Sequence, residues 1–222
     1  MRTRSIVSAV VALICSTNVL AAEFALYPTG PSEDAAFIRF VNASSAPLDV
    51  VAQAGQPPMR LETAQPVSLF FPVQSTSPVK GTLVSGAQKL AMDLKIEPGE
   101  FATVVAVADG AGIKQVAVRE QPDDFNGLKA SLAFFNVDAS CADASLRPAG
   151  RTADLFKAVP VDNLQRRSIN PVSLSVQLVC ANANVGEPLN LGDLKAGERY
   201  SVLLVPSATG PRLLNATDTL SH

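Results

Sequence analysis

Residues 36–44 have the sequence AFIRFVNAS, and residues 130–138 have the related sequence ASLAFFNVD. Each is a short apolar run that ends at an asparagine, Asn42 in the first and Asn136 in the second. A second pair follows in the same order, with DLKIEPGEFATVVAV at 93–107 and DLKAGERYSVLLV at 193–205. Internal similarity at a fixed spacing is the signature of a repeated structural unit, so the sequence predicts two copies of one unit of about 95 residues.

The segments between these landmarks have the composition of strands. They are short runs rich in Val, Leu, Phe and Thr, and Pro and Gly separate them. In residues 173–178 polar and apolar side chains alternate, as in a half-buried strand. We therefore expect an all-β fold of two tandem β-sandwich domains related by internal duplication, each with seven or eight strands. Residues 143–160 lack this pattern and are interpreted as a loop with at most one helical turn near 154–157.

The beginning of the chain has the features of an export signal. Arg2 and Arg4 precede an apolar run, and Val19 and Ala21 fit the small-residue pattern of a signal-peptidase site. We expect a signal peptide at 1–21, cleaved after Ala21 or Ala22, with a retained anchor as the alternative. The N-terminal sandwich would occupy 22–120, a polar linker 121–128, and the C-terminal sandwich 129–222. The mature protein would then lie in the periplasm.

Two cysteines remain after removal of the leader, because Cys15 lies inside it. An even number in an exported protein indicates a disulfide, here between Cys141 and Cys180. A bridge that closes a loop of about 40 residues is expected to stabilise the second unit by roughly 3–4 kcal/mol. Two buried free thiols are the alternative. A zinc site is less favoured, since no CxxC or HxxxH spacing accompanies the cysteines.

Catalytic patterns are missing from the sequence. Its single histidine is the last residue, His222, and a chain end is a poor place for an oriented general base. No GxSxG or phosphate-binding glycine loop occurs. The formal net charge of −2 gives no indication of nucleic-acid binding. We expect a protein that is not an enzyme and needs no cofactor or metal.

Four residues are candidate contacts with a partner protein or a polymer: Arg39, Arg166, Arg167 and Tyr27. The Arg166–Arg167 pair precedes the strand-like segment SINPVSLSV and has the charge to bind an acidic polymer. The alternative is that the pair marks an exposed sheet edge, where charged residues discourage pairing with other chains.

Three stretches resemble a known family in the right order along the chain: ALYPTGPSEDAAFIRFVNAS at 25–44, RRSINPVSLSVQL at 166–178 and LKAGERYSVLLV at 194–205. They are similar to the AlgF family, periplasmic proteins of the alginate O-acetylation machinery. The resemblance implies two tandem β-sandwiches and a non-catalytic adaptor. Such an adaptor links a membrane-bound O-acyltransferase to periplasmic SGNH-type acetyl-transfer proteins. The segment PTGPSED at 28–34 and the cysteine pair depart from the family pattern, so the polymer is either alginate or bacterial cellulose.

Other functions remain open on the sequence alone. An exopolysaccharide-binding module without a role in acetylation is one, although sugar platforms usually expose aromatic rings and this chain has no Trp. After removal of the leader its tyrosines are Tyr27 and Tyr200. An esterase or acetyltransferase with an unusual site is another, and a generic adhesive or structural sandwich is the last.

Overall fold

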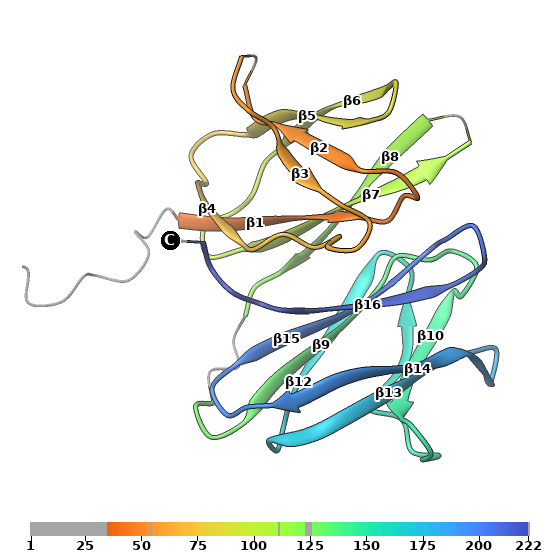
Figure 1. Cartoon of the computed structure of the whole chain (residues 1–222). Helices are drawn as coiled ribbons and strands as arrows, with labels where there is room; N and C mark the ends of the chain where they lie inside the picture. The colour runs from red at the N-terminus through yellow and green to blue at the C-terminus, as the bar shows by residue number, and fades with distance from the viewer. Residues whose placement is uncertain (1–34, 54, 111, 123–125, 222) are drawn as a thin grey trace, which may run out of the picture. The chain divides into compact units, whose positions relative to one another are not determined.

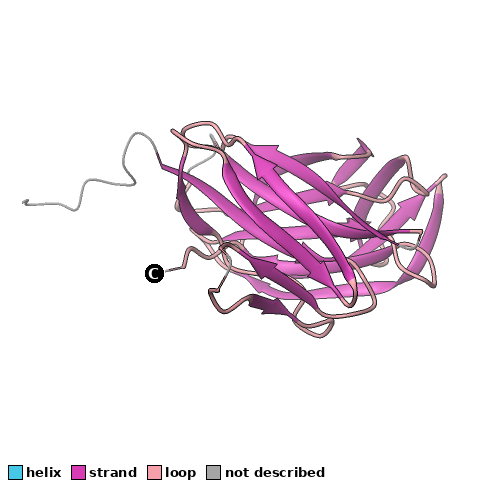
Figure 2. Cartoon of the chain, turned by 90° about the horizontal axis from the view of Figure 1, so that it is seen from above, coloured by secondary structure: helices cyan, strands magenta, loops and turns pink. Residues whose placement is uncertain are grey.

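The structure is a computed structural model that describes residues 35–53, 55–110, 112–122 and 126–221. The expected signal peptide, its cleavage site and Tyr27 lie outside the described residues. Within these ranges the chain consists of strands and loops (Figure 2), and no helix there is long and apolar enough to cross a membrane.

The first half of the chain contributes eight strands: β1 (Ala35–Asn42), β2 (Leu48–Val51), β3 (Met59–Leu61), β4 (Phe71–Gln74), β5 (Val79–Ser85), β6 (Gln88–Leu94), β7 (Phe101–Asp109) and β8 (Gly112–Glu120). The second half contributes another eight: β9 (Ala130–Asn136), β10 (Asp143–Pro148), β11 (Phe156–Pro160), β12 (Asn163–Ile169), β13 (Val172–Cys180), β14 (Ala183–Leu194), β15 (Arg199–Val205) and β16 (Arg212–Thr217). The expected domain boundaries at 22–120 and 129–222 stay a prediction.

The two halves have the same sheet topology. The first half forms sheets ordered β4-β1-β7-β8 and β3-β2-β5-β6, and the second forms β12-β9-β15-β16 and β11-β10-β13-β14. Each strand of the second half occupies the place of the strand eight positions earlier. The fold class predicted from the repeat, two duplicated β-sandwiches, is confirmed.

The repeated glycine turns have the same task in both halves. β1 pairs in parallel with β7, and β9 pairs in parallel with β15. At the start of each pair the N–H of Gly99 donates to Ala35 O at 2.8 Å, and that of Gly197 donates to Lys129 O at 2.9 Å. Both glycines have a positive φ, 75° and 78°, a conformation that a side chain makes unfavourable. The turn explains why the Gly-Glu pair occurs in both copies.

The two landmark asparagines fasten one sheet to the other. Asn42 donates from Nδ2 to Leu61 O at 3.1 Å, at the end of β3. Asn136 donates from Nδ2 to Val159 O at 2.9 Å, in the equivalent strand β11. Neither side chain is exposed to solvent. Each asparagine therefore satisfies buried backbone groups across its own sandwich, which is a structural role.

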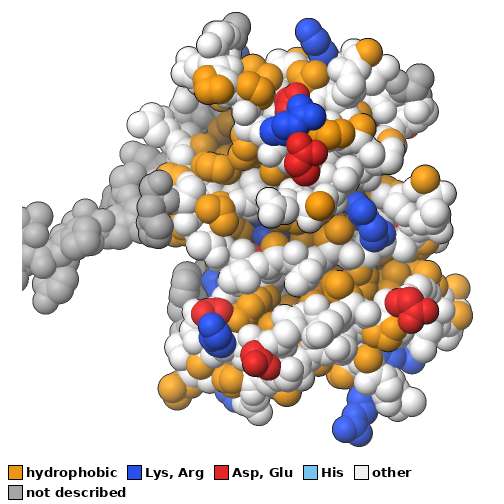
Figure 3. Space-filling model, in the orientation of Figure 1, with side chains coloured by type: hydrophobic (Ala, Val, Ile, Leu, Met, Phe, Trp, Pro, Cys, Tyr) orange, Lys and Arg blue, Asp and Glu red, His pale blue; other side chains and the backbone are white. Residues whose placement is uncertain are grey.

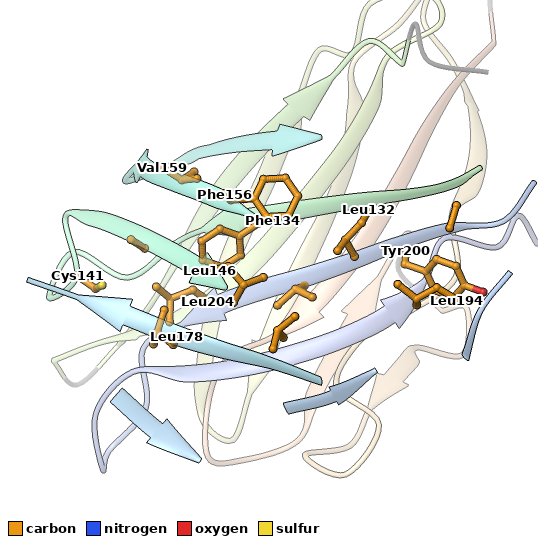
Figure 4. Packing of buried hydrophobic residues seen from close by; sticks show 14 residues of the cluster. Leu132, Phe134, Cys141, Leu146, Phe156, Val159, Leu178, Leu194, Tyr200 and Leu204 are labelled. Atoms are coloured by element: carbon orange, nitrogen blue, oxygen red, sulfur yellow. The ribbon is translucent and has the colours of Figure 1, made fainter. Parts of the chain in front are cut away.

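Four sheets lie on one another as layers (Figure 1), with an apolar core between each neighbouring pair. One core fills the first sandwich and another fills the second, and Figure 4 shows the second, with Phe134, Phe156, Leu146 and Leu178 pointing into it. The third core joins the sandwiches and consists of Val41, Ala43, Val105, Val107, Val118, Ala133, Phe135, Val137, Leu203 and Val205. Because β1 and β9 are covered on both faces, they are buried almost throughout, and their side chains are apolar apart from Arg39, Ser131 and the final asparagines.

The interpretation of residues 143–160 as a loop was wrong. This segment holds β10 and β11, which pair with each other as β2 and β3 do in the first half. The pairing contains a register shift between Ala144 and Leu146, and Ala158 has a positive φ of 50°. A bulge of this kind breaks the alternation of side chains by which a strand is recognised in a sequence.

The predicted disulfide is present. Cys141 and Cys180 are joined with a Cα–Cα distance of 5.4 Å, which is within the normal range. Cys141 lies just before β10 and Cys180 is the last residue of β13, so the bridge fastens two neighbouring strands of the outer sheet at one end of the second sandwich.

Candidate functional site

Arg39 lies at the centre of a charged cluster between the two sandwiches. Its side chain is only 1 % exposed and stands between the rings of Phe70 and Phe135, at 4.5 Å and 5.2 Å from their centroids. Its Nε donates to Thr103 Oγ1 and its Nη2 donates to Ser201 Oγ, both at 2.9 Å. These two hydroxyls occupy equivalent positions of the repeat, so one arginine of β1 joins β7 to β15.

The negative partner of Arg39 is Asp218, just after the end of β16. Asp218 Oδ1 accepts from Arg39 Nη1 at 2.7 Å, and its side chain is 4 % exposed. The residues that follow Asp218 form backbone hydrogen bonds with the first sandwich: Phe70 N donates to Thr219 O, and Ser221 N donates to Phe70 O. The C-terminal segment of the second half therefore pairs with the first half and delivers the carboxylate to Arg39.

Arg166 on β12 closes the cluster from the other side. It donates to Asp218 Oδ2 at 2.9 Å and forms a two-pronged ion pair with Glu120 at the end of β8. Arg199 also lies near Glu120, with its Nη2 at 3.6 Å from Oε1. We call Arg39, Arg166, Glu120 and Asp218 the charged joint. The pairs Arg39–Asp218 and Arg166–Glu120 each link the first half to the second, whereas Arg166–Asp218 lies within the second half.

The electrostatics of the charged joint favour the ionised forms. Burial alone would raise the pKa of Asp218, but Arg39 and Arg166 outweigh it, so the pKa of Asp218 lies below its usual value. For Arg166 burial acts to lower the pKa, and the bonds to Glu120 and Asp218 outweigh it and raise the pKa. Burial lowers the pKa of Arg39, yet a guanidinium stays protonated throughout the neutral range.

The expected contact residues fall into two groups in the structure, buried and exposed. The guanidinium groups of Arg39 and Arg166 are engaged inside the charged joint, which gives both a structural task. Arg167, the next residue on edge strand β12, is exposed and donates to Leu155 O at 2.6 Å. A role of these three arginines or Tyr27 in binding a partner or polymer stays a prediction.

Sequence reasoning missed the acidic half of the joint, Glu120 and Asp218, as well as the hydroxyls of Thr103 and Ser201. Asp218 is 179 positions from Arg39, and nothing in its local sequence marks it. The repeat offered one signal, because Thr103 and Ser201 follow the two Gly-Glu turns at the same distance.

The described part of the chain has no group of three or more His, Cys, Asp or Glu side chains placed to hold a metal ion. On the face shown in Figure 3 the charged side chains of both signs are scattered, singly or in small groups, rather than gathered into a patch of one sign.

The fold and the joint together define a class: a duplicated two-sandwich protein whose halves share a buried interface. The particular family follows from a family model described as "Alginate O-acetyl transferase AlgF", which matches residues 9–201. The chain belongs to the AlgF family, whose members are periplasmic proteins of the alginate O-acetylation machinery. The resemblance found from the three sequence stretches is confirmed, and membership implies a role in alginate O-acetylation.

A solved structure described as "The Bacillus anthracis TIE protein" is similar at 11 % identity with a TM-score of 0.26, over 77 % of this chain and 34 % of that chain. This chain thus spans about a third of that structure's length, and a likeness at this level carries no argument about function. No curated protein matches the chain.

Proposed function

We propose that the chain is a non-catalytic adaptor in exopolysaccharide O-acetylation, which links a membrane-bound O-acyltransferase to periplasmic SGNH-type acetyl-transfer proteins. Family membership supports the pathway. The adaptor role is supported chiefly by the stack of two copies of one module, held together by an apolar core and the charged joint. Each copy presents one outer sheet, β3-β2-β5-β6 or β11-β10-β13-β14, so the protein has two related surfaces for two partners.

The proposal assigns the chemistry to the partners, although the family description contains the word transferase. The sequence has one histidine, His222, whereas acyl transfer through an activated serine needs a base within hydrogen-bond reach of the nucleophile. Arg166 and Asp218 of the second half pair with each other and with Glu120 and Arg39 of the first half. This pairing of the buried charges supports a role in holding the two sandwiches together rather than in catalysis.

The polymer and the route of export are part of the same proposal. The family model favours alginate, and bacterial cellulose is the alternative substrate of related machinery. Export would follow cleavage after Ala21 or Ala22, and the mass of the mature protein isolated from the periplasm checks the cleavage site.

Deletion of the gene in the producing cells tests the pathway. We expect the secreted polymer to lose its O-acetyl groups, measured by proton NMR, while the polymer yield is kept, and a plasmid copy of the full chain should restore acetylation. Normal acetyl content in the deletion strain would refute the proposal.

Two further measurements separate an adaptor from an enzyme. A tagged full chain should co-purify both the acyltransferase and an SGNH-type protein, and recovery of neither would contradict a linking role. The purified protein should not hydrolyse a chromogenic acetyl ester above the buffer rate. Turnover that a single substitution abolishes would instead identify an enzyme.

A further inference from the structure

The core of the second sandwich reaches solvent at one edge, where β12 ends and β13 begins. An open groove of about 470 Å³ lies there. Its lining includes residues at the ends of neighbouring strands: Pro148, Arg151, Leu155, Ile169, Val172 and Leu174. We call these six residues the β13 groove. Val172 is 47 % exposed, so a large apolar side chain of the groove faces solvent without cover in the described part of the chain.

Three positive charges surround the β13 groove. Arg151 belongs to its lining and is exposed. Arg167 donates to the backbone carbonyl of Leu155, and Lys129 donates to the side chain of Asn170, which also lines the opening. None of these three cations forms an ion pair within the residues that the structure describes. Among the arginines expected from the sequence to contact a partner, Arg167 is thus an exposed one with no acidic partner in these ranges.

The acids on this part of the second sandwich leave the three charges unpaired. Asp154 is engaged by Arg147, with Nε at 3.0 Å from Oδ1. Asp193 is the register partner of Ser173 and is exposed, and it forms no ion pair among the described residues. The groove therefore keeps an excess of positive charge next to an apolar surface.

The β13 groove has an equivalent in the first sandwich, a hollow of about 260 Å³ whose lining includes Val73 and Val79. Val73 pairs with the first strand of its half as Ile169 does in the second half. Val79 pairs with the last residue of β6, as Val172 pairs with the last residue of β14. The apolar opening therefore belongs to the repeated unit, since it occurs at the same position in both copies.

The two openings differ in charge. Arg167 occupies the repeat position of Phe71, because the two residues pair with equivalent positions of β9 and β1. The cation in the lining of the hollow, Lys80, is paired with Asp93 at 3.5 Å. The β13 groove thus combines an apolar surface with unpaired positive charge, whereas the hollow has the apolar surface with its cation paired.

We propose that the β13 groove binds a segment of a partner protein in which an apolar side chain is flanked by acidic residues. The apolar side chain occupies the groove beside Val172, since anchors of this kind fill concave apolar pockets at protein interfaces. The flanking carboxylates pair with Arg151, Arg167 and Lys129, because complementary rim charges steer association and fix its register. This inference rests on the proposed function, because it gives the adaptor a defined site for one protein partner.

Fluorescence polarisation on the purified full chain tests the proposal, with the labelled peptide Gly-Asp-Glu-Leu-Phe-Glu-Asp-Gly as the probe. We expect saturable binding that the double variant Arg151→Gln, Arg167→Gln weakens about tenfold, since two charge pairs are lost. Binding should also weaken as salt is added, because salt screens exposed charges. Lys114→Gln is the matched control, because Lys114 is an exposed cation of the first sandwich and its loss should leave binding unchanged.

Two altered peptides separate the two parts of the recognition. One has Asn and Gln in place of the acids, and the other has two alanines in place of Leu-Phe. Each should bind about tenfold more weakly than the probe, since one loses the charges and the other loses the anchor. Equal binding of either altered peptide, or no binding of the probe, would overturn the proposal.

The hollow of the first sandwich is a control within the same molecule. Met59 and Met92 line it, and apart from Met1 they are the methionines of the sequence, so methyl-labelled methionine reports on the hollow by NMR. The probe should shift the amide signals of Ile169 and Val172 and leave the methyl signals of Met59 and Met92 in place. Equal shifts at both openings would show that the peptide recognises apolar surface without regard to charge, against the proposal.

An anionic membrane is the other surface that combines acidic and apolar groups. Co-sedimentation with phosphatidylglycerol vesicles that depends on Arg151 and Arg167, without binding of the probe peptide, would assign the groove to a membrane and reject the protein partner. The variants must unfold at the temperature of the parent chain. If the double variant unfolds earlier because Arg167 no longer bonds to Leu155 O, the single variant Arg151→Gln decides, since Arg151 is exposed.

Failure of this inference is distinct from failure of the adaptor role. Peptide binding is measured on the purified protein, whereas the adaptor role is measured by acetylation in the deletion strain.

Discussion

The two sandwiches have one topology and different ways of closing their cores. In the first, a hollow of about 260 Å³ is lined by Ile38, Phe71, Met59, Met92 and other residues of the sandwich, and β5 contains a glycine, Gly81. A side chain at Gly81 would bring its Cβ to 2.9 Å from Val51 O. In the second, the equivalent residue is Leu174, which packs against the core, and the disulfide fastens β10 to β13.

This difference indicates that the two copies of the unit are stabilised in different ways. The second sandwich has its own covalent fastening and contributes Asp218 and Arg166 to the charged joint. The first sandwich has no cysteine, and it is held through Arg39, Glu120 and the pairing of Phe70 with the C-terminal segment. We infer that the first sandwich depends on the second more than the reverse.

Breaking the charged joint should have the largest effect. Asp218→Ala leaves Arg39 buried without its carboxylate, and removal of one member of a buried ion pair costs about 3–5 kcal/mol. Denaturant unfolding measures the loss, and hydrogen exchange should show faster opening of β1 and β7 than of β10 and β13. The control is Asp93→Ala, whose surface pair with Lys80 is worth less than about 1 kcal/mol. An equally small loss for Asp218→Ala would contradict the joint.

Removal of the disulfide should have the next largest effect and should fall on the second sandwich. The double variant Cys141→Ser, Cys180→Ser is expected to lose about 3–4 kcal/mol, because the open chain gains conformational freedom over 39 positions. Hydrogen exchange should accelerate in β10 and β13 first. Reduction of the disulfide in the parent chain must lower the free energy of unfolding by the same amount. An equal acceleration of hydrogen exchange in β2 and β5 would show that the disulfide does not act on the second sandwich in particular.

The landmark asparagines give a smaller and more discriminating comparison. Asn42→Ala and Asn136→Ala each leave buried backbone acceptors unpaired, at a cost of about 1–3 kcal/mol. We expect Asn136→Ala to be the milder, since the disulfide at Cys141 holds the same loop. The difference should vanish when the disulfide is removed, which a double-mutant cycle measures. If Asn136→Ala remains milder than Asn42→Ala without the disulfide, the difference arises from the loops and not from the bridge.

Acid should produce the smallest effect. The pKa of Asp218 is lower in the folded protein than in the unfolded chain, so its contribution is complete above the unfolded pKa and is lost as the pH falls through the folded pKa. The stability difference between the parent chain and Asp218→Asn should therefore be constant from about pH 8 to pH 5 and shrink below about pH 4. Urea unfolding at each pH measures it, and a difference that grows toward acid would reverse the assigned sign.

Much of the fold was predictable because it depends on local pattern. The repeat of an apolar run ending in asparagine and of a Gly-Glu turn predicted the duplication, since both motifs make the same backbone contacts in each copy. The even number of cysteines after the expected signal peptide predicted the disulfide. The paired strands β10 and β11 were missed because a bulge at Ala158 interrupts the alternation on which recognition of strands depends.

The candidate sites were less predictable. Arg39 and Arg166 were recognised as notable, but their partners Asp218 and Glu120 were not. Charges attract whichever opposite charge the fold brings near, and sequence separation gives no measure of that distance.

The amino-acid sequence thus determined the two sandwiches, their shared topology and the covalent fastening of the second. The mostly apolar segments that form β1 and β9 were recognised as strands, but their sequences did not show what covers their two faces. Stacking of the inner sheets supplied that answer and placed Asp218 beside Arg39. The physical reason is that local pattern reports how much of a strand is buried, whereas pairing across the interface depends on which surfaces meet.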